Sequence, residues 1–362
     1  MRAHWMLGVR CWLLDVFQVF VGQARRPPYF NSMTTIDDTS PRFGQTDWVS
    51  GRTLGLVMFA GVLAIVMSLV SPNFLTAETF FSQSRYVAFY VLVAMSQAIC
   101  LAIGDMNLAV GAVGSIATVA FGLLVAPDQA HLSPWIAVPL VFLIGPITGL
   151  LHGFVITRLK IDAFIVTLSM MFVYMGLRSG ISGGNAYTIP QSFWWLGQSG
   201  LGWLPYMVII VLVILCGVSI LYGRTVLGRW LIATGTNPLA TRFSGINTNR
   251  MVVIAHALSG CFAVLAAIVW ASQSGNAAPQ TGDDWLIISF AVAIIGGTGL
   301  KGNLISPFGI LMGAIIFKLI QHALVILKIN DNYSNTLLGG LILLAIIVDR
   351  ARERFGGKEN TR

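Results

Sequence analysis

The stretch from Pro205 to Tyr222 reads P-Y-M-V-I-I-V-L-V-I-L-C-G-V-S-I-L-Y and contains no charged residue. An α-helix needs about 20 mainly apolar residues to cross the hydrocarbon core of a bilayer. The stretch comes close to that length, and it predicts one membrane-spanning helix. Similar stretches recur along the whole chain, so their number and spacing determine the fold class.

The composition of the whole chain points the same way. Of its 362 residues, 56% are hydrophobic and only 10% are charged, and the mean hydropathy is +0.79. A soluble domain carries about 25% charged residues. The composition therefore excludes a soluble globular protein, a disordered protein and a disulfide-stabilised scaffold, and it indicates a polytopic membrane protein.

Charged residues divide the chain into spans, because they are costly at the centre of a bilayer. We predict an all-α polytopic membrane protein with about ten transmembrane helices in two pseudo-symmetric halves, with broken or short helices at a central pathway. Arg178 closes one short span, because an arginine at a helix end can reach the interface. The predicted spans are 53–71, 86–104, 108–126, 134–156, 161–178, 205–222, 251–271, 285–300, 305–327 and 334–348.

An even number of spans places both termini on one side of the membrane. If the termini are cytoplasmic, 18 of the 22 Lys and Arg residues lie on the cytoplasmic side, as the positive-inside rule requires. The net charge of +8 and the pI of about 9.6 thus reflect the orientation of the chain in the membrane. They do not indicate a nucleic-acid partner, and we expect none. We expect a multi-pass protein of the cell inner membrane.

The spans divide the chain into a cytoplasmic segment at 1–50, a transmembrane domain at 51–350 and a basic cytoplasmic tail at 351–362. The apolar stretches before residue 20 suit an amphipathic helix at the membrane interface. The alternative, which we favour, is that translation begins at Met33, which would leave residues 1–32 untranslated.

The sequence contains no recognisable catalytic or metal-binding motif. Cys100, Cys216 and Cys261 fall inside predicted spans, where we expect them to act as small packing residues. The five histidines show no H-E-x-x-H or Cys/His spacing, and no G-x-x-x-x-G-K-[ST] phosphate loop occurs. We therefore expect no enzyme activity, no cofactor and no metal, and any ATP-driven work requires a partner.

The segment Gly104 to Gly111 reads G-D-M-N-L-A-V-G and lies between the second and third predicted spans. It has no basic residue, but it carries a carboxylate at Asp105 and an amide at Asn107. Irregular backbone at membrane depth is tolerated only where it is buried or lines a water-filled cavity. Two interpretations stay open: a broken-helix segment that faces a polar pathway, and a tight turn near the cytoplasmic surface.

A second glycine-dense segment, Gly296 to Asn303, reads G-G-T-G-L-K-G-N and lies between the eighth and ninth predicted spans. Like the first, it contains an Asn and separates short spans. Corresponding interruptions in two halves are typical of an internal repeat around a transport pathway, which makes Gly297 and Asn303 candidate pathway residues. The alternative is close helix packing at glycines, which we favour for Gly309 and Gly313.

The stretch Ala233 to Ile246 reads A-T-G-T-N-P-L-A-T-R-F-S-G-I and lies in a predicted cytoplasmic loop. Asn237 suits the N-cap of a helix, Pro238 its first position and Gly245 its end. These signals predict one short helix that projects into the cytoplasm. It is either a docking element for a soluble partner or an ordinary interfacial helix.

Four stretches together resemble the membrane-spanning permease subunit of ribose-type ABC sugar importers. Gly104–Gly111 resembles that family's G-G-I-D-L-S-V-G stretch, and Gly296–Gly302 resembles its G-G-T-x-L-x-G pattern. Ala233–Ile246 resembles its cytoplasmic motif, and Lys160–Leu168 resembles its K-x-x-P-F-I-x-T-L segment. The resemblance covers about residues 50–350, and the motifs stand in the family's order.

The resemblance implies a sugar permease that pairs with a second permease subunit, as a homodimer or a heterodimer. It also implies a cytoplasmic ATP-binding subunit and a periplasmic substrate-binding protein as partners. The short cytoplasmic helix would then dock onto the ATP-binding subunit. The coupling residues implied in this way are Gly235, Asn237, Pro238, Ala240, Arg242 and Gly245.

The chain departs from the family pattern at the first segment. Asn107 stands where the family usually has Asp, and Asp105 stands where it has Gly, so a solute other than ribose is compatible with the sequence. A permease for branched-chain amino acids or nucleosides stays open, as does a stand-alone secondary transporter that uses Asp105 and Lys318. We expect structural roles for four intramembrane polar residues, which are Gln97, Lys318, Gln321 and His322.

Overall fold

The computed structural model describes residues 51–71, 74, 76–299, 302 and 304–326, together with residues 336, 339, 340 and 343, all within one compact unit. The predictions for residues 1–50 and 351–362, for Asn303 and for most of the span at 334–348 therefore fall outside the described residues.

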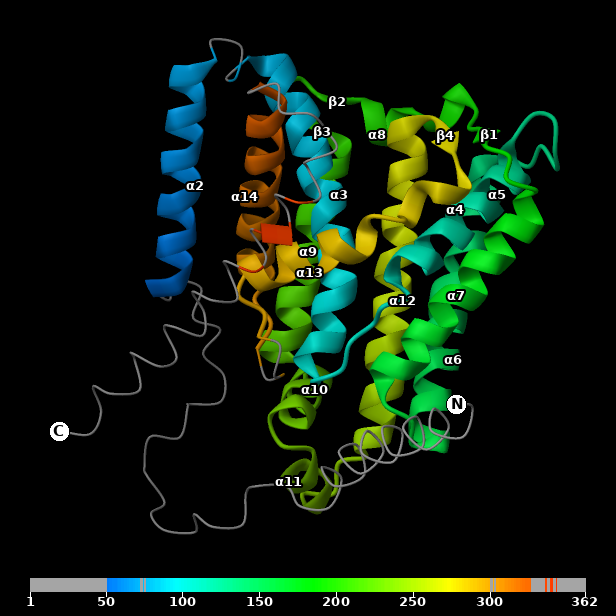
Figure 1. The fold of residues 1–362 in the computed structure, drawn as a ribbon, viewed down its shortest axis with the longest axis vertical. Helices are drawn as coiled ribbons and strands as arrows, with labels where there is room; N and C mark the ends of the chain where they lie inside the picture. The colour runs from blue at the N-terminus through cyan, green and yellow to red at the C-terminus, as the bar shows by residue number, and fades with distance from the viewer. Residues whose placement is uncertain are drawn as a thin grey trace, which may run out of the picture. The chain divides into compact units, whose positions relative to one another are not determined.

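The described part of the chain is mostly helical, and six of its helical segments are long and apolar enough to cross a membrane. This confirms a multi-pass membrane protein built from α-helices. Local signals set several helix starts: the Thr76 hydroxyl caps the first of these segments and the Asp162 carboxylate caps the third. The six segments are α3 (Ala77–Ala102), α5 and α6 together (Pro134–Leu159), α7 (Ala163–Ser182), α9 (Tyr206–Arg224), α12 (Thr248–Ser274) and α14 (Pro307–Ile326), as Figure 1 shows.

Further apolar helices correspond to other predicted spans. They are α2 (Gly51–Val70), α4 (Val110–Val125) and α13 (Trp285–Ile295), which is the shortest of the three. The span predicted at 134–156 is divided in the structure, since α5 (Pro134–Phe142) ends before Leu143 and α6 (Ile144–Leu159) follows it. Pro139 lies inside α5, and a proline interrupts the helical hydrogen bonds of the preceding turn.

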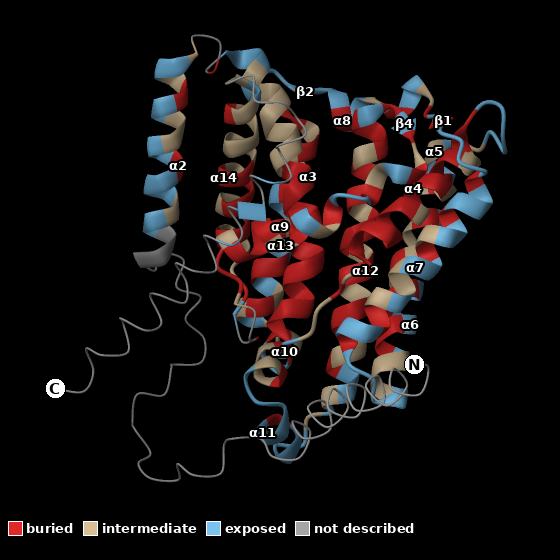
Figure 2. Ribbon diagram, in the orientation of Figure 1, coloured by how far each residue is buried: buried red, intermediate tan, exposed pale blue. Residues whose placement is uncertain are grey.

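The buried core consists mainly of α3, α4, α12 and α13, while the outer faces of α2, α6 and α7 expose apolar side chains (Figure 2). Helices α6 and α12 pack closely because Gly145, Gly149 and Gly153 follow one another at every fourth position of α6. A Cβ atom on Gly149 would overlap the carbonyl oxygen of His256 on α12. This glycine series is a sequence signal for the helix pair that our sequence reasoning missed.

Short elements connect the helices at the two ends of the bundle. At one end β1 (Tyr187–Thr188) pairs with β4 (Asn276–Ala277), and β2 (Gly200–Leu201) pairs with β3 (Leu204–Pro205), both antiparallel. The same region contains η2 (Gln191–Phe193), α8 (Trp195–Gln198) and η3 (Pro279–Gly282). At the other end lie α10 (Val226–Thr236) and α11 (Pro238–Phe243), as Figure 1 shows.

Arg178, which we predicted to close a short span, has a buried side chain and lies one turn before the end of α7. Helix α7 continues to Ser182, and the Arg178 side chain is only 7% exposed. Its guanidinium forms an ion pair with Asp283 at 2.6 Å and donates a hydrogen bond to the Ser115 hydroxyl at 2.8 Å. Arg178 thus ties α7 to α4 and to the segment before α13, because burial of its charge requires a partner.

Candidate functional site

The first predicted segment begins with a tight turn at the end of α3. The amide of Asp105 donates to the carbonyl of Cys100 at 3.0 Å, and the amide of Gly104 donates to the carbonyl of Leu101 at 2.9 Å. This bond pair is a Schellman motif, which needs a left-handed residue at its glycine position. Gly104 has φ +84°, which explains why a glycine stands there.

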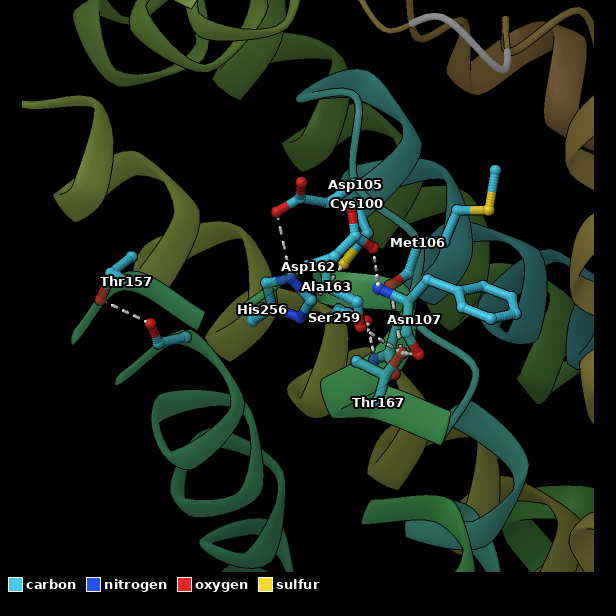
Figure 3. Close-up of polar contacts among 12 residues, drawn as sticks. Cys100, Asp105, Met106, Asn107, Thr157, Asp162, Ala163, Thr167, His256 and Ser259 are labelled. Atoms are coloured by element: carbon cyan, nitrogen blue, oxygen red, sulfur yellow. Dashed lines mark hydrogen bonds and ion pairs between the residues drawn. The ribbon is translucent and has the colours of Figure 1, made fainter. Parts of the chain in front are cut away.

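Two buried side chains then hold the segment against neighbouring helices. Asn107 is 1% exposed; its Oδ1 accepts a hydrogen bond from the amide of Ala109, and its Nδ2 donates to the Ser259 hydroxyl of α12 at 2.9 Å. The amide of Leu108 donates to the Thr167 hydroxyl of α7 at 3.1 Å. Figure 3 shows Asn107, Thr167 and Ser259 close to one another. Asn107 therefore fixes the backbone just before α4.

Asp105 occupies a different environment from Asn107. One oxygen of its carboxylate lies 3.4 Å from Nε2 of His256, and its side chain is 24% exposed. His256 is fully buried on α12, and its Nδ1 lies 3.8 Å from Sγ of Cys100 (Figure 3). The segment thus keeps one partly accessible carboxylate, and a buried imidazole holds it in position.

The second predicted segment begins with the same turn. After α13, the amide of Thr298 donates to the carbonyl of Ala293 and the amide of Gly297 donates to the carbonyl of Ile294, both at 2.9 Å. Gly297 has φ +88°, close to the value at Gly104. Both interrupted segments therefore follow their helices through a Schellman motif with glycine in the left-handed conformation.

The structure brings three predicted glycine-containing stretches together at one point. A Cβ atom on Gly302 would lie 2.7 Å from the carbonyl oxygen of Gly235 and 3.1 Å from the amide nitrogen of Gly104. A Cβ atom on Gly235 would overlap the carbonyl oxygen of Ala102, the last residue of α3. We call Gly104, Gly235 and Gly302 the glycine junction. It joins both interrupted segments to the C-terminal turn of α10.

The predicted cytoplasmic helix is present as α11. The Asn237 side chain accepts a hydrogen bond from the amide of Ala240 at 3.0 Å, and Pro238 is the first helical residue. Gly245 has φ +81°, as the predicted end of a helix requires. The Thr241 hydroxyl donates to the carbonyl of Ala233, which fastens α11 to α10.

One face of α11 is exposed in the described part of the chain. Leu239 is 69% exposed and Phe243 is 90% exposed, four positions apart and therefore on one side of the helix. Ala240 and Arg242 are exposed as well. A short helix that presents two apolar side chains and an arginine is suited to contact with another protein.

Gly111 has a packing role in this structure. A Cβ atom on Gly111 would overlap the carbonyl oxygen of Gly282, so α4 and η3 approach there backbone to backbone.

Sequence reasoning identified Asp105 but missed its partner His256, because the two residues are far apart in the chain. Among the residues that the structure describes, no group of three or more His, Cys, Asp or Glu side chains could hold a metal ion.

A family model described as "Branched-chain amino acid transport system / permease component" matches residues 79–346. The ribose import permease protein of Escherichia coli K12 is 26% identical over 330 residues, which cover 89% of this chain and all of that protein. The L-arabinose transport system permease protein of the same strain is 32% identical over 83% of this chain and 90% of its own length.

The autoinducer 2 import system permease protein of Escherichia coli O9:H4 is 29% identical over 83% of this chain and 89% of its own length. These names denote transport permeases, and they confirm the resemblance seen in the four sequence stretches. No solved structure matches the chain.

Proposed function

This chain belongs to the family of branched-chain amino acid transport system permease components, and we propose that it forms the pathway of an ATP-driven importer for a monosaccharide. The relatives named for ribose and L-arabinose import support a sugar as the solute. The energy comes from a separate ATP-binding subunit, because the sequence has no phosphate loop of its own.

The glycine junction is the structural observation that carries the proposal. An ATP-binding subunit that moves the exposed α11 would also move α10, since Thr241 fastens the two helices together. At Gly235, α10 touches the backbone of α3 and of Gly302 without intervening side chains. Motion is therefore passed directly to both interrupted segments, because close-packed backbone cannot absorb it.

We further propose the number of spans, the side of the membrane on which the termini lie, and the partner subunits. The shared turns at Gly104 and Gly297 support two pseudo-symmetric halves, and the uncharged runs of the sequence support about ten spans in the whole chain. Both termini, including 1–50 and the tail 351–362, are cytoplasmic in this proposal, with the chain in the inner membrane. A second permease subunit and a periplasmic substrate-binding protein complete the complex.

The pathway residues of this proposal are the six predicted from the sequence, which are Gly104, Asp105, Asn107, Gly111, Gly297 and Asn303. Asp105 is the one with an accessible charged group in the described part of the segment, so we assign it to contact with the solute. Asn107 and the glycines shape the backbone of the pathway.

Reconstitution into liposomes tests the proposed function. We expect uptake of labelled ribose or arabinose only when the ATP-binding subunit, the substrate-binding protein and ATP are all present. Deletion of 238–244 should abolish this uptake while the chain still inserts, and Phe243→Ser should weaken binding of the ATP-binding subunit. Uptake by the chain alone, driven by an ion gradient, would refute the importer and support a secondary transporter. Uptake of leucine in place of sugars would redirect the proposal to amino acids.

A further inference from the structure

A polar stripe runs along one face of α3. It consists of Gln83, Tyr86, Tyr90 and Gln97, which are spaced by three, four and seven residues. At about 100° per residue these spacings place all four side chains within roughly 60° of one another. The stripe therefore extends from the partly exposed first half of α3 into its buried second half, Ala88–Ala102.

The first three members of the stripe each contact a polar side chain of α14. Gln83 contacts His322, while Tyr90, two turns further along α3, packs edge-on against Phe317 with ring centroids 5.3 Å apart. The residue numbers therefore rise along α3 as they fall along α14, and the two helices are antiparallel at this contact. The contacts are Gln83 Nε2 to His322 Nδ1 at 3.1 Å, Lys318 Nζ to the ring centroid of Tyr86 at 4.1 Å, and the Tyr90 hydroxyl to Gln321 Oε1 at 2.6 Å. These pairs are the interhelical polar contacts by which membrane helices associate.

Gln97 differs from the other three members. Its side chain is fully buried, yet neither Nε2 nor Oε1 has a hydrogen-bond partner among the residues that the structure describes. The antiparallel register brings α14 residues near 310–314 to its level, and all of these are non-polar. An unpaired buried polar group costs about 1–3 kcal/mol, so Gln97 weakens the fold at this position.

Thr298 carries a second buried polar group of this kind. Its hydroxyl has no partner within the described ranges, and the residue is 2% exposed. Thr298 lies on the segment that passes from Gly296, packed against Gly309 of α14, to Gly302, packed against Gly104 at the end of α3. The two unpaired groups thus belong to α3 and to the segment that crosses between α14 and α3.

We propose that Gln97 and Thr298 each hydrogen-bond to an uncharged, polyhydroxylated solute that passes between α3 and the segment after α13. This inference rests on the proposed function and names residues that contact the solute. The side-chain amide of Gln97 has two N–H donors and one acceptor oxygen, and the Thr298 hydroxyl can both donate and accept a hydrogen bond. Unpaired groups that lower stability are expected where they serve a ligand.

The decisive variant is Gln97→Leu, because it separates a ligand site from a structural contact. Leucine removes two unpaired polar atoms, so the melting temperature of the purified chain in detergent should stay equal or rise. Loss of these bonds to solute should lower the maximal sugar uptake of the full complex about five- to tenfold. Gln97→Asn keeps the amide and should retain more uptake, and Thr298→Val should lower uptake without loss of stability.

Gln321→Leu is the matched control, since it removes a glutamine that is paired with Tyr90 and should lower the melting temperature. If Gln97→Leu lowers the melting temperature as Gln321→Leu does, Gln97 is a structural contact and the inference is wrong. Unchanged uptake kinetics in Gln97→Leu would overturn it as well. Failure of the wild-type complex to take up any monosaccharide would instead refute the proposed function, and the inference with it.

Discussion

A Cβ atom on Gly302 would lie 2.7 Å from the carbonyl oxygen of Gly235. Gly302 belongs to the segment after α13, while Gly235 belongs to the last turn of α10, which leads into α11. The same Cβ atom on Gly302 would lie 3.1 Å from the amide nitrogen of Gly104, at the end of α3. Helix α10, which leads into the exposed helix α11, is therefore in backbone contact with both interrupted segments of the bundle.

Removal of the Asn107 side chain should destabilise the start of α4. Asn107→Ala leaves the amide of Ala109 without its partner and removes one of the two partners of the Ser259 hydroxyl, the other being the Ser96 hydroxyl, which should cost about 1–3 kcal/mol. Asn107→Asp should cost less, because a carboxyl group accepts from the amide and the Ser259 hydroxyl can rotate to donate. Thermal unfolding in detergent compares the two. If Asn107→Ala and Asn107→Asp lower the melting temperature equally, these hydrogen bonds do not hold the segment.

Arg178 and Asp283 form an ion pair, and loss of Asp283 should destabilise the protein more than loss of Arg178. Asp283 is 41% exposed and can be hydrated when alone, whereas Arg178 is buried. Asp283→Ala leaves a buried charge and should cost about 3–5 kcal/mol, while Arg178→Met should cost less. The double variant should be more stable than Asp283→Ala alone. Additive losses in the melting temperatures would contradict this account.

Asp105 and His256 should show energetic coupling. Asp105→Asn, His256→Gln and the double variant form a cycle in which we expect a coupling of about 0.5–3 kcal/mol in detergent unfolding. Because its carboxylate is partly exposed, Asp105→Asn should change sugar uptake more than stability. A coupling near zero would mean that His256 does not position Asp105.

The glycine series of α6 should tolerate no side chain. Gly149→Ala would press a methyl group into the carbonyl oxygen of His256, and overpacking of this kind costs about 1–3 kcal/mol. Gly176→Ala is the control, since no atom lies within 4 Å of an added Cβ there and alanine favours the helix by about 1 kcal/mol. Similar melting temperatures for the two variants would argue against close α6–α12 packing.

Local signals in the sequence predicted much of this fold. The cap at Asn237, the proline at Pro238 and the glycine at Gly245 predicted α11 almost to the residue, because each acts on its own few neighbours. The uncharged runs predicted most helices for the same reason. The family resemblance rested on four short stretches, and the match over residues 79–346 confirmed it.

Features that depend on packing between distant segments were not predictable in this way. Arg178 looked like the end of a span, because its partner Asp283 is more than 100 residues away. The sequence identified Asp105, but its environment depends on His256 of α12. The glycine junction joins residues from three separate stretches, and only the folded chain reveals that they meet.

The most direct test of the coupling is the number of ATP molecules hydrolysed per sugar imported by the reconstituted complex with Gly235→Ala. The added methyl group forces α10 away from Ala102 of α3, whereas Gly217→Ala, with no atom within 4 Å of its Cβ, is the control. We predict that Gly235→Ala keeps ATP hydrolysis but lowers uptake, so that the ratio rises, while Gly217→Ala matches the wild type. An unchanged ratio in a stably inserted Gly235→Ala complex would contradict transmission through the glycine junction.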